Sequence, residues 1–455
     1  MPPVGQNPEK GAPVSAGERY LILRRVYIPG YESRRLTDLL LLLSPKAIGR
    51  EGGEETARIL RVAPEIRVES RENGRWSSFD AKGAVIAPAF VDSFCRFGSS
   101  EYFYRENPSS GGSAAKAGGF GCLFLFPQTR LNSRSGLSSF RRRMGDIGVM
   151  VCPALSLVGG RVQELLALRR EFSIEPPLLF SDEGGDQLPD DALLELMKTV
   201  AKENGTLFCL GRSSPGGGAV NEGKVAKLMG DPGISPVFER LYVANRLLLS
   251  AATGCRIHFP VISEAESITM IREAKRAGIP VTCGTTPLYF SMTDNDLIYR
   301  GNACRVDPPL RSERDRMAVI EAIADGTVDC ICSGHTPLSP YEKQGDIRRA
   351  LPGAATLETV FSAGMTYLVE SGAIPLERFL HCLTAGPSAL IGKRATVAEG
   401  ESGDLVLLDP DAEVICSDST MKSRARNTPF LGMALRGRVD ALLLGGRFVY
   451  RSRGE

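Results

Sequence analysis

The hydrophobic and polar positions divide the chain into three parts. Residues 19–87 carry short apolar runs with partial alternation, separated by glycine-containing turns, and this pattern predicts β-strands. The same pattern returns after residue 392. We therefore expect the two ends of the chain to form one composite β-sandwich domain, from residues 19–87 and 393–455.

The central part, residues 88–392, alternates amphipathic helices with apolar strands. Units of a helix followed by a strand occupy residues 190–210, 266–284 and 315–334. In the first unit, apolar residues at three- and four-residue spacing define one helix face: Leu193, Leu196, Met197 and Val200. Non-alternating strands between such helices are typical of a parallel sheet covered by helices, so this α/β pattern predicts a (β/α)8 TIM-type barrel. A doubly wound open sheet is the alternative, but no dinucleotide-binding fingerprint follows an early strand.

Composition and charge narrow the class of protein. The chain has 455 residues, a hydrophobic content of 43% and a net charge of +2. No basic excess points to nucleic acid or to an anionic membrane surface. The apolar run Leu39–Leu43 is far shorter than the ~20 residues that a transmembrane helix needs. Residues 1–18 lack the apolar core of a signal peptide and are predicted to be a disordered leader, so we expect a cytoplasmic protein.

The residue types that usually bind catalytic metals are few. The 11 Cys are scattered without CxxC pairs, and several lie in apolar strand-like runs, as is typical of buried thiols in a reducing compartment. There are three His in the whole sequence: His258, His335 and His381. A binuclear metal site normally uses several His, so this count argues against one.

Four stretches of the sequence together carry a family resemblance. They are PAFVDSFCRFG at residues 88–98, RVDPPLRSERDR at 305–316, LPGAATLETV at 351–360 and GESGDLVLLDP at 400–410. The chain after residue 18 resembles the dihydroorotases of the amidohydrolase superfamily, in which the first stretch reads approximately PGFIDLHVHLREPG. The resemblance implies a (β/α)8 barrel with a composite β-sandwich and an ancestor in pyrimidine biosynthesis. It also implies metal-assisted hydrolysis of a cyclic amide, with a metal-activated water and an Asp as general base.

Most positions that the resemblance assigns to the active site carry other residues in this chain. The family's ligand, base and substrate positions are here Phe94, Arg96, Gly98, Gln128, Asp182, Leu210, Val261, Asp307, Gly334 and His335. Only Asp182 and His335 survive among them, and Gly334 stands at the position of the general base. Zinc needs at least three protein ligands. The sequence therefore predicts a vestigial pocket with no catalytic residue and no metal site.

Two contacts are expected in this pocket. Arg96 would be costly in a buried position without a partner, so we expect it to pair with Asp182 where the metal would stand. We expect His335 to make a structural hydrogen bond at the rim of the barrel.

Three functions remain open at this stage. The first is a catalytically inactive dihydroorotase-like protein that acts as a structural or assembly partner, for example of aspartate carbamoyltransferase or of an active dihydroorotase, and that forms a homo-oligomer. The second is an active cyclic-amide hydrolase with a rebuilt zinc site, drawing on thiols or on Asp92, Asp182, Glu183, Asp307 and His335. The third is a non-catalytic small-molecule binder that uses Arg96, Gln128 and Asp307. Only the second would need a cofactor, which is zinc.

Overall fold

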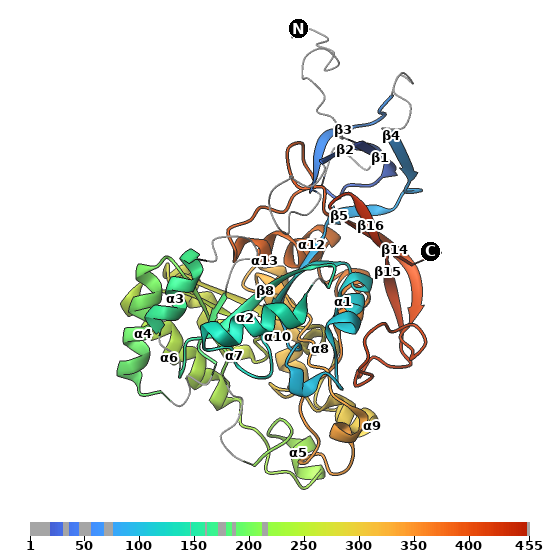
Figure 1. Ribbon diagram of the computed structural model, residues 1–455. Helices are drawn as coiled ribbons and strands as arrows, with labels where there is room; N and C mark the ends of the chain where they lie inside the picture. The colour runs from blue at the N-terminus through green and yellow to red at the C-terminus, as the bar shows by residue number, and fades with distance from the viewer. Residues whose placement is uncertain are drawn as a thin grey trace.

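The computed structural model describes residues 19–30, 36–44, 56–67, 76–145, 147–159, 162–171, 179–183, 188–211 and 217–452. The predicted leader, residues 1–18, lies outside this part of the chain. Along the described residues, a β-rich beginning leads into an α/β centre and then into a β-rich end (Figure 1). This is the order that the hydrophobic pattern predicts.

The central sheet is a closed parallel barrel. Its eight strands follow one another in chain order. Between the last strand and the first, the backbone N–H of Gly334 donates to Phe94 O (3.0 Å) and that of Arg96 donates to His335 O (2.7 Å). The prediction of a (β/α)8 barrel is therefore confirmed. The strands are β6 (Phe90–Cys95), β7 (Phe120–Leu125), β8 (Met150–Ser156), β9 (Leu179–Ser181), β10 (Thr206–Phe208), β11 (Arg256–Phe259), β12 (Val281–Thr285) and β13 (Cys330–Ile331).

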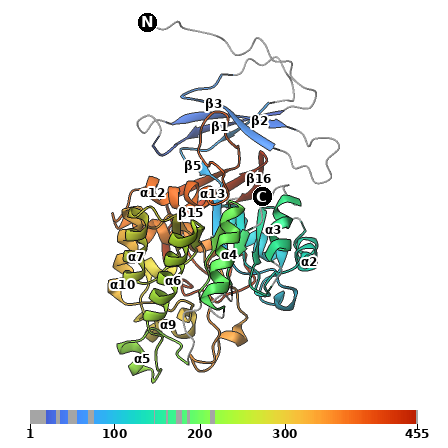
Figure 2. The ribbon, with the colours of Figure 1, turned by 90° about the vertical axis from the view of Figure 1, so that its left-hand side faces the viewer.

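Helices cover the outside of the barrel, as Figure 2 shows for α4, α6, α7 and α10. The apolar face predicted for α4 is buried, so its periodicity reports this packing. The longer helices are α1 (Pro108–Ala117), α2 (Arg134–Met144), α3 (Val162–Glu171), α4 (Asp190–Lys202), α6 (Val237–Thr253), α7 (Ala265–Arg276), α10 (Glu313–Ala324) and α12 (Leu376–Leu383). Shorter ones are α5 (Lys224–Leu228), α8 (Pro287–Ser291), α9 (Asp296–Arg300), α11 (Val360–Gly364) and α13 (Ala385–Ala389). Single turns are η1 (Ser100–Tyr102), η3 (Gly301–Cys304), η4 (Pro340–Lys343), η5 (Leu357–Thr359) and η6 (Met365–Glu370). None of the helices in the described ranges is long and apolar enough to cross a membrane.

Two four-stranded sheets lie beside the end of the barrel at which its strands begin (Figure 1). The first has the order β3-β2-β1-β4 and contains β1 (Arg19–Val26), β2 (Thr37–Ser44), β3 (Thr56–Ala63) and β4 (Trp76–Asp80). The second has the order β16-β15-β14-β5 and contains β5 (Val85–Pro88), β14 (Leu405–Ile415), β15 (Ala434–Leu444) and β16 (Arg447–Arg451). Because β5 pairs antiparallel with β14, both ends of the chain share this sheet. Only Ala89 separates β5 from the first barrel strand, β6.

Apolar side chains fill the space between the sheets and the interior of the barrel. Between the sheets, Leu23 and Leu39 pack with Leu405 and Leu443 from the other end of the chain. Inside the barrel, aromatic rings lie in contact, with centroids 5.9 Å apart for Phe124 and Phe208, 5.6 Å for Phe126 and Phe208, and 5.1 Å for Phe94 and Phe126. The interior is a packed core, as is usual for an eight-stranded barrel of this kind.

Candidate functional site

A cavity of 450 Å³ lies where the barrel strands end, and we call it the mouth. In barrels of this fold, active sites lie at this end of the strands. Seven of the predicted pocket positions line the mouth: Phe94, Arg96, Gln128, Leu210, Val261, Asp307 and Gly334. Gly98, Asp182 and His335 are not among the residues that line it.

The floor of the mouth is apolar. Phe94 is buried and packs in the barrel interior together with Leu210 and Val261. These three side chains carry no atom with a lone pair that could bind a metal. Filling this space with apolar groups avoids the cost of burying polar groups without partners.

The cation at the mouth is paired with a different carboxylate from the one expected. The Arg96 Nη2 lies 2.5 Å from Oε1 of Glu183, and the two side chains are 23% and 19% exposed. The predicted pair of Arg96 with Asp182 is therefore wrong. The reason lies in the end of β9, where neighbouring residues direct their side chains to different partners: Glu183 reaches the mouth, and Asp182 reaches α6.

Asp182 belongs to a buried network with α6. Its Oδ2 accepts hydrogen bonds from Nε of Arg246 (2.7 Å) and from the Tyr242 hydroxyl (2.9 Å), and its Oδ1 accepts one from the backbone N–H of Leu210 (2.8 Å). Burial lowers the pKa of Arg246, but Asp182 together with Tyr242 and Cys209 outweighs this effect, so the net shift is upward. Asp182 is thus committed to an arginine, a tyrosine and the backbone.

The side chain of His335 is fully buried and does not line the mouth. Its Nδ1 accepts a hydrogen bond from the backbone N–H of Thr356 (3.1 Å), and its Nε2 lies 3.4 Å from Oε2 of Glu106. The predicted structural hydrogen bond is confirmed. Burial raises the pKa of Glu106, but His335 and the hydroxyls of Ser110 and Ser423 outweigh it and leave the pKa lowered. The His335 side chain therefore contacts the backbone at Thr356 and the buried Glu106, which in turn accepts hydrogen bonds from Ser423 and Arg424.

Gly334 and Gly98 each stand where a side chain would collide with its surroundings. Gly334 has φ +64°, and a Cβ added there would lie 2.7 Å from Cγ2 of Thr286. Gly98 has φ +91°, and its Cβ would lie 2.9 Å from Sδ of Met144. Both backbones adopt a left-handed conformation that favours glycine. The position of the family's general base therefore has no side chain here and a left-handed backbone.

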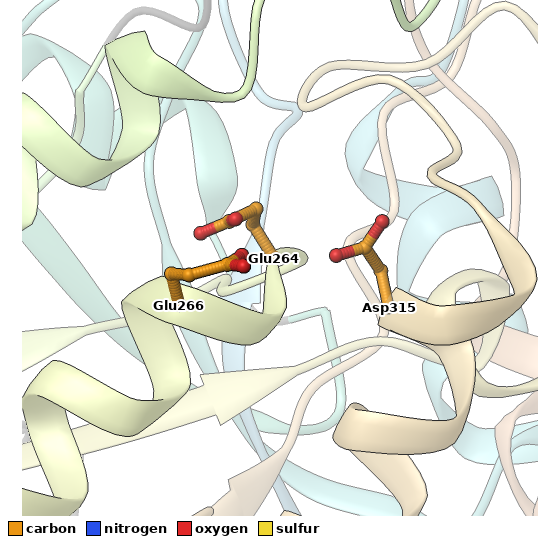
Figure 3. Close-up of side chains that lie close together, drawn as sticks. All are labelled: Glu264, Glu266 and Asp315. Carbon is orange, nitrogen blue, oxygen red and sulfur yellow. The ribbon is translucent and has the colours of Figure 1, made fainter. Parts of the chain in front are cut away.

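A group of three carboxylates lies at the beginnings of α7 and α10 (Figure 3). Ligand atoms of Glu264, Glu266 and Asp315 lie within 4.8 Å of one another. Arg240 lies 2.9 Å from Glu264 and 3.4 Å from Glu266, and the backbone N–H of Ala265 donates to Asp315 (3.0 Å). Burial and the hydrogen bond with Glu266 raise the pKa of Glu264 to about 7, while the same bond lowers that of Glu266 to about 2. The pKa shifts of the two glutamates are thus opposed, and Glu264 and Asp315 take part in capping α7 and α10.

Comparison with known proteins identifies the relatives of this chain. No family model matches it. The dihydroorotase of Anaeromyxobacter dehalogenans (strain 2CP-C) is 32% identical over 430 residues, which cover 91% of this chain and 98% of that protein. The chain belongs to the dihydroorotase family. The dihydroorotase of Shouchella clausii (strain KSM-K16) is 31% identical over 408 residues, which cover 88% of this chain and 96% of that protein.

Solved structures of cyclic-amide hydrolases share the fold. The L-hydantoinase (dihydropyrimidinase) from Arthrobacter aurescens has a TM-score of 0.79 at 19% identity, covering 96% of each chain. The dihydropyrimidinase from Brevibacillus agri NCHU1002 has a TM-score of 0.77 at 18% identity. These structures place the chain in a (β/α)8 barrel with an adjoining β-sandwich, as the dihydroorotase resemblance implies.

The mouth of this dihydroorotase homologue does not fit the zinc of a hydrolase. Zinc takes Cys, His or carboxylate ligands, at least three of them from the protein in a catalytic site. Within the described residues that line the mouth, the carboxylates are Glu183, which pairs with Arg96, and Asp307. Cys209 also lines it, but within the described residues it does not join Glu183 and Asp307 in a group close enough to share a metal ion. Glu183, Asp307 and Cys209 therefore do not form a zinc site above the apolar floor around Phe94.

Sequence reasoning missed two residues of this region, Tyr242 and Arg246, and it considered Glu183 as a metal ligand and not as the partner of Arg96. Arg246 did carry a local signal, because in α6 it shares the buried face of Val243, Leu247 and Ser250. A cation on such a face needs a buried anion. The choice of Glu183 over Asp182 as the partner of Arg96 carried no such signal.

Proposed function

We propose that this dihydroorotase homologue of the pyrimidine-biosynthesis type does not hydrolyse cyclic amides and that it acts as a structural or assembly partner. The observation that supports this most is Gly334. An Asp there would need a left-handed backbone and would force its Cβ against Thr286. The chain therefore lacks a general base where the family's chemistry needs one, and Phe94 fills the floor beside it.

Candidate partners follow from the family. The barrel and both sheets persist over a length shared with active dihydroorotases, so an assembly surface can persist as well. We infer association with aspartate carbamoyltransferase or with an active dihydroorotase, as a homo-oligomer in the cytoplasm. The 11 free, buried thiols support a reducing compartment.

The test measures catalysis and assembly separately. The full-length protein is assayed for dihydroorotase activity in both directions, with and without added zinc, beside an active dihydroorotase. No turnover is expected in either direction. Zinc-dependent turnover that a chelator abolishes would contradict the inactive assignment. Sedimentation with aspartate carbamoyltransferase and with the active dihydroorotase of the same organism should give a heavier species with one of them, and sedimentation as separate species in both mixtures would contradict the partner role.

One observation favours a second candidate, a small-molecule binder. Oε1 of Gln128 is buried without a hydrogen-bond partner, while its Nε2 donates to Arg96 O (3.0 Å). An orphaned acceptor in a 450 Å³ cavity suits a ligand N–H group. Calorimetric titration with dihydroorotate and carbamoyl aspartate tests this. Binding that is lost in Gln128→Leu would support the candidate, and equal heats in both proteins would reject it.

A further inference from the structure

Sulfur-bearing side chains gather at the other end of the barrel interior. Cys122 of β7 pairs in register with Met150 of β8, and Cys152 lies two residues further along β8. Paired residues and residues two apart point to the same face of a sheet. Cys122 and Cys152 pack in the barrel interior with Met150 at its border, and their Sγ atoms are 3.7 Å apart.

This group can be reached from outside the barrel. A second cavity, of 510 Å³, lies between the beginning of the barrel strands and the two terminal sheets. Cys122, Met150 and Lys393 line it. Cys152 is fully buried behind them. An ion entering the cavity therefore meets one thiol and the thioether, with the second thiol within reach.

The geometry suits a metal better than a disulfide. Cys122 and Cys152 are diagonal neighbours on adjacent strands, and such positions have Cα atoms about 7–8 Å apart. Disulfides need a separation below about 6.8 Å, so the strands would have to move. Two thiolates that bind one ion at ~2.3 Å each stand roughly 3.8 Å apart in a tetrahedral arrangement. The 3.7 Å between the two Sγ atoms already matches that distance.

The ligand types and the local charge select the metal. Thiolate together with thioether favours soft monovalent copper over zinc. A complex of two thiolates and one Cu⁺ carries a charge of −1, and the ammonium of Lys393 lies 3.8 Å from Sδ of Met150. We propose that Cys122, Cys152 and Met150 form a binding site for one Cu⁺ ion at the base of the barrel.

Binding in this site is linked to proton release. The hydrogen bond with Cys152 and burial raise the pKa of the Cys122 thiol well above its ordinary value. The Cys122 thiol of the metal-free protein is therefore protonated at neutral pH, and Cu⁺ must displace its proton. The affinity for Cu⁺ should consequently rise with pH.

The experiment titrates the reduced, full-length protein with Cu⁺ under anaerobic conditions, against a competing Cu⁺ chelator. One Cu⁺ per chain is expected. Cys122→Ala and Cys152→Ala should each weaken binding by roughly 100-fold or more, and Met150→Leu by about tenfold. The matched control is Cys304→Ala, which removes a buried thiol from η3 and should leave the affinity unchanged.

The outcomes separate a built site from general thiol binding. Circular dichroism melts check that each variant is folded, and Cys122→Ser and Cys152→Ser replace any alanine variant that is not. An affinity that falls equally in Cys304→Ala, or that persists in both the Cys122 and Cys152 variants, would overturn the proposal. So would a wild-type protein that takes no copper from the chelator at any pH between 6 and 8.

Discussion

Two neighbouring carboxylates that follow β9, Asp182 and Glu183, each pair with an arginine. The surroundings of the two pairs differ. Asp182 and Arg246 are 0% and 4% exposed and connect the barrel to α6. Glu183 and Arg96 are 19% and 23% exposed and lie at the mouth. A buried pair costs much to break, because one charge is left without a partner, whereas water can replace a partner at the rim. The inner pair should therefore hold the fold, while the outer pair should mainly shape the mouth.

The largest effect is expected from breaking the buried pair. Arg246→Ala leaves Asp182 as an uncompensated buried charge and should lower the free energy of unfolding by about 3–5 kcal/mol. Urea denaturation measures it. Lys198→Ala on α4 is the control, because it breaks an ion pair whose side chains are 45% and 71% exposed, and its loss should cost much less. The double variant Asp182→Asn/Arg246→Met removes both charges and should recover most of the loss. If Arg246→Ala and the control variant lower the free energy of unfolding equally, the buried pair does not hold the fold more strongly than an exposed pair.

A buried carboxyl without an arginine sharpens the same comparison. Asp92 is fully buried and accepts hydrogen bonds from Ser333 N (2.7 Å) and Phe94 N (3.2 Å), yet burial raises its pKa to about 6. Well below pH 4 the carboxyl is protonated in both the folded and the unfolded state. As the pH rises from 4 to 6, the unfolded state loses this proton while the folded state largely keeps it. The free energy of unfolding therefore falls.

The measurement is the free energy of unfolding of the wild type and of Asp92→Asn at several pH values. Relative to the variant, the wild type should lose roughly 2 kcal/mol between pH 4 and pH 6.5. Taking the difference between the two proteins removes the contributions of the other titrating groups. A difference that stays flat with pH would show that the hydrogen bonds from Ser333 keep Asp92 ionised.

The smallest effect is expected at the mouth. Arg96→Met removes the outer pair and keeps most of the apolar contact, so it should cost no more than about 1 kcal/mol. The same denaturation assay, repeated at high salt, should give nearly the same value for wild type and variant. A loss as large as that of Arg246→Ala would mean that the mouth pair holds the barrel together.

The barrel was predictable because helix and strand periodicity is a local property of the sequence. The burial of the α4 face, including Leu193 and Val200, follows directly from residue spacing. The contacts of the mouth were not predictable in the same way. Whether Asp182 or Glu183 meets Arg96 depends on how β9 ends, and tertiary packing sets that end.

The pairing register of the strands likewise limited what the sequence could predict at the base of the barrel. Cys122 and Cys152 are 30 residues apart, and their thiols meet only because β7 and β8 pair in one particular alignment. The sequence suggested that these residues are buried thiols, and all 11 Cys are indeed buried and free. It offered no signal for which of them would lie next to each other.

The placement of β5 has a consequence for the synthesis of the protein. Its partner β14 follows roughly 300 residues later in the chain. At ~5–20 residues per second, a ribosome needs on the order of 15–60 s to reach it. During that time β5 lacks its partner strand, and an unpaired strand edge is prone to aggregation. A chain that stops before Leu405 should therefore aggregate more readily than the full-length protein.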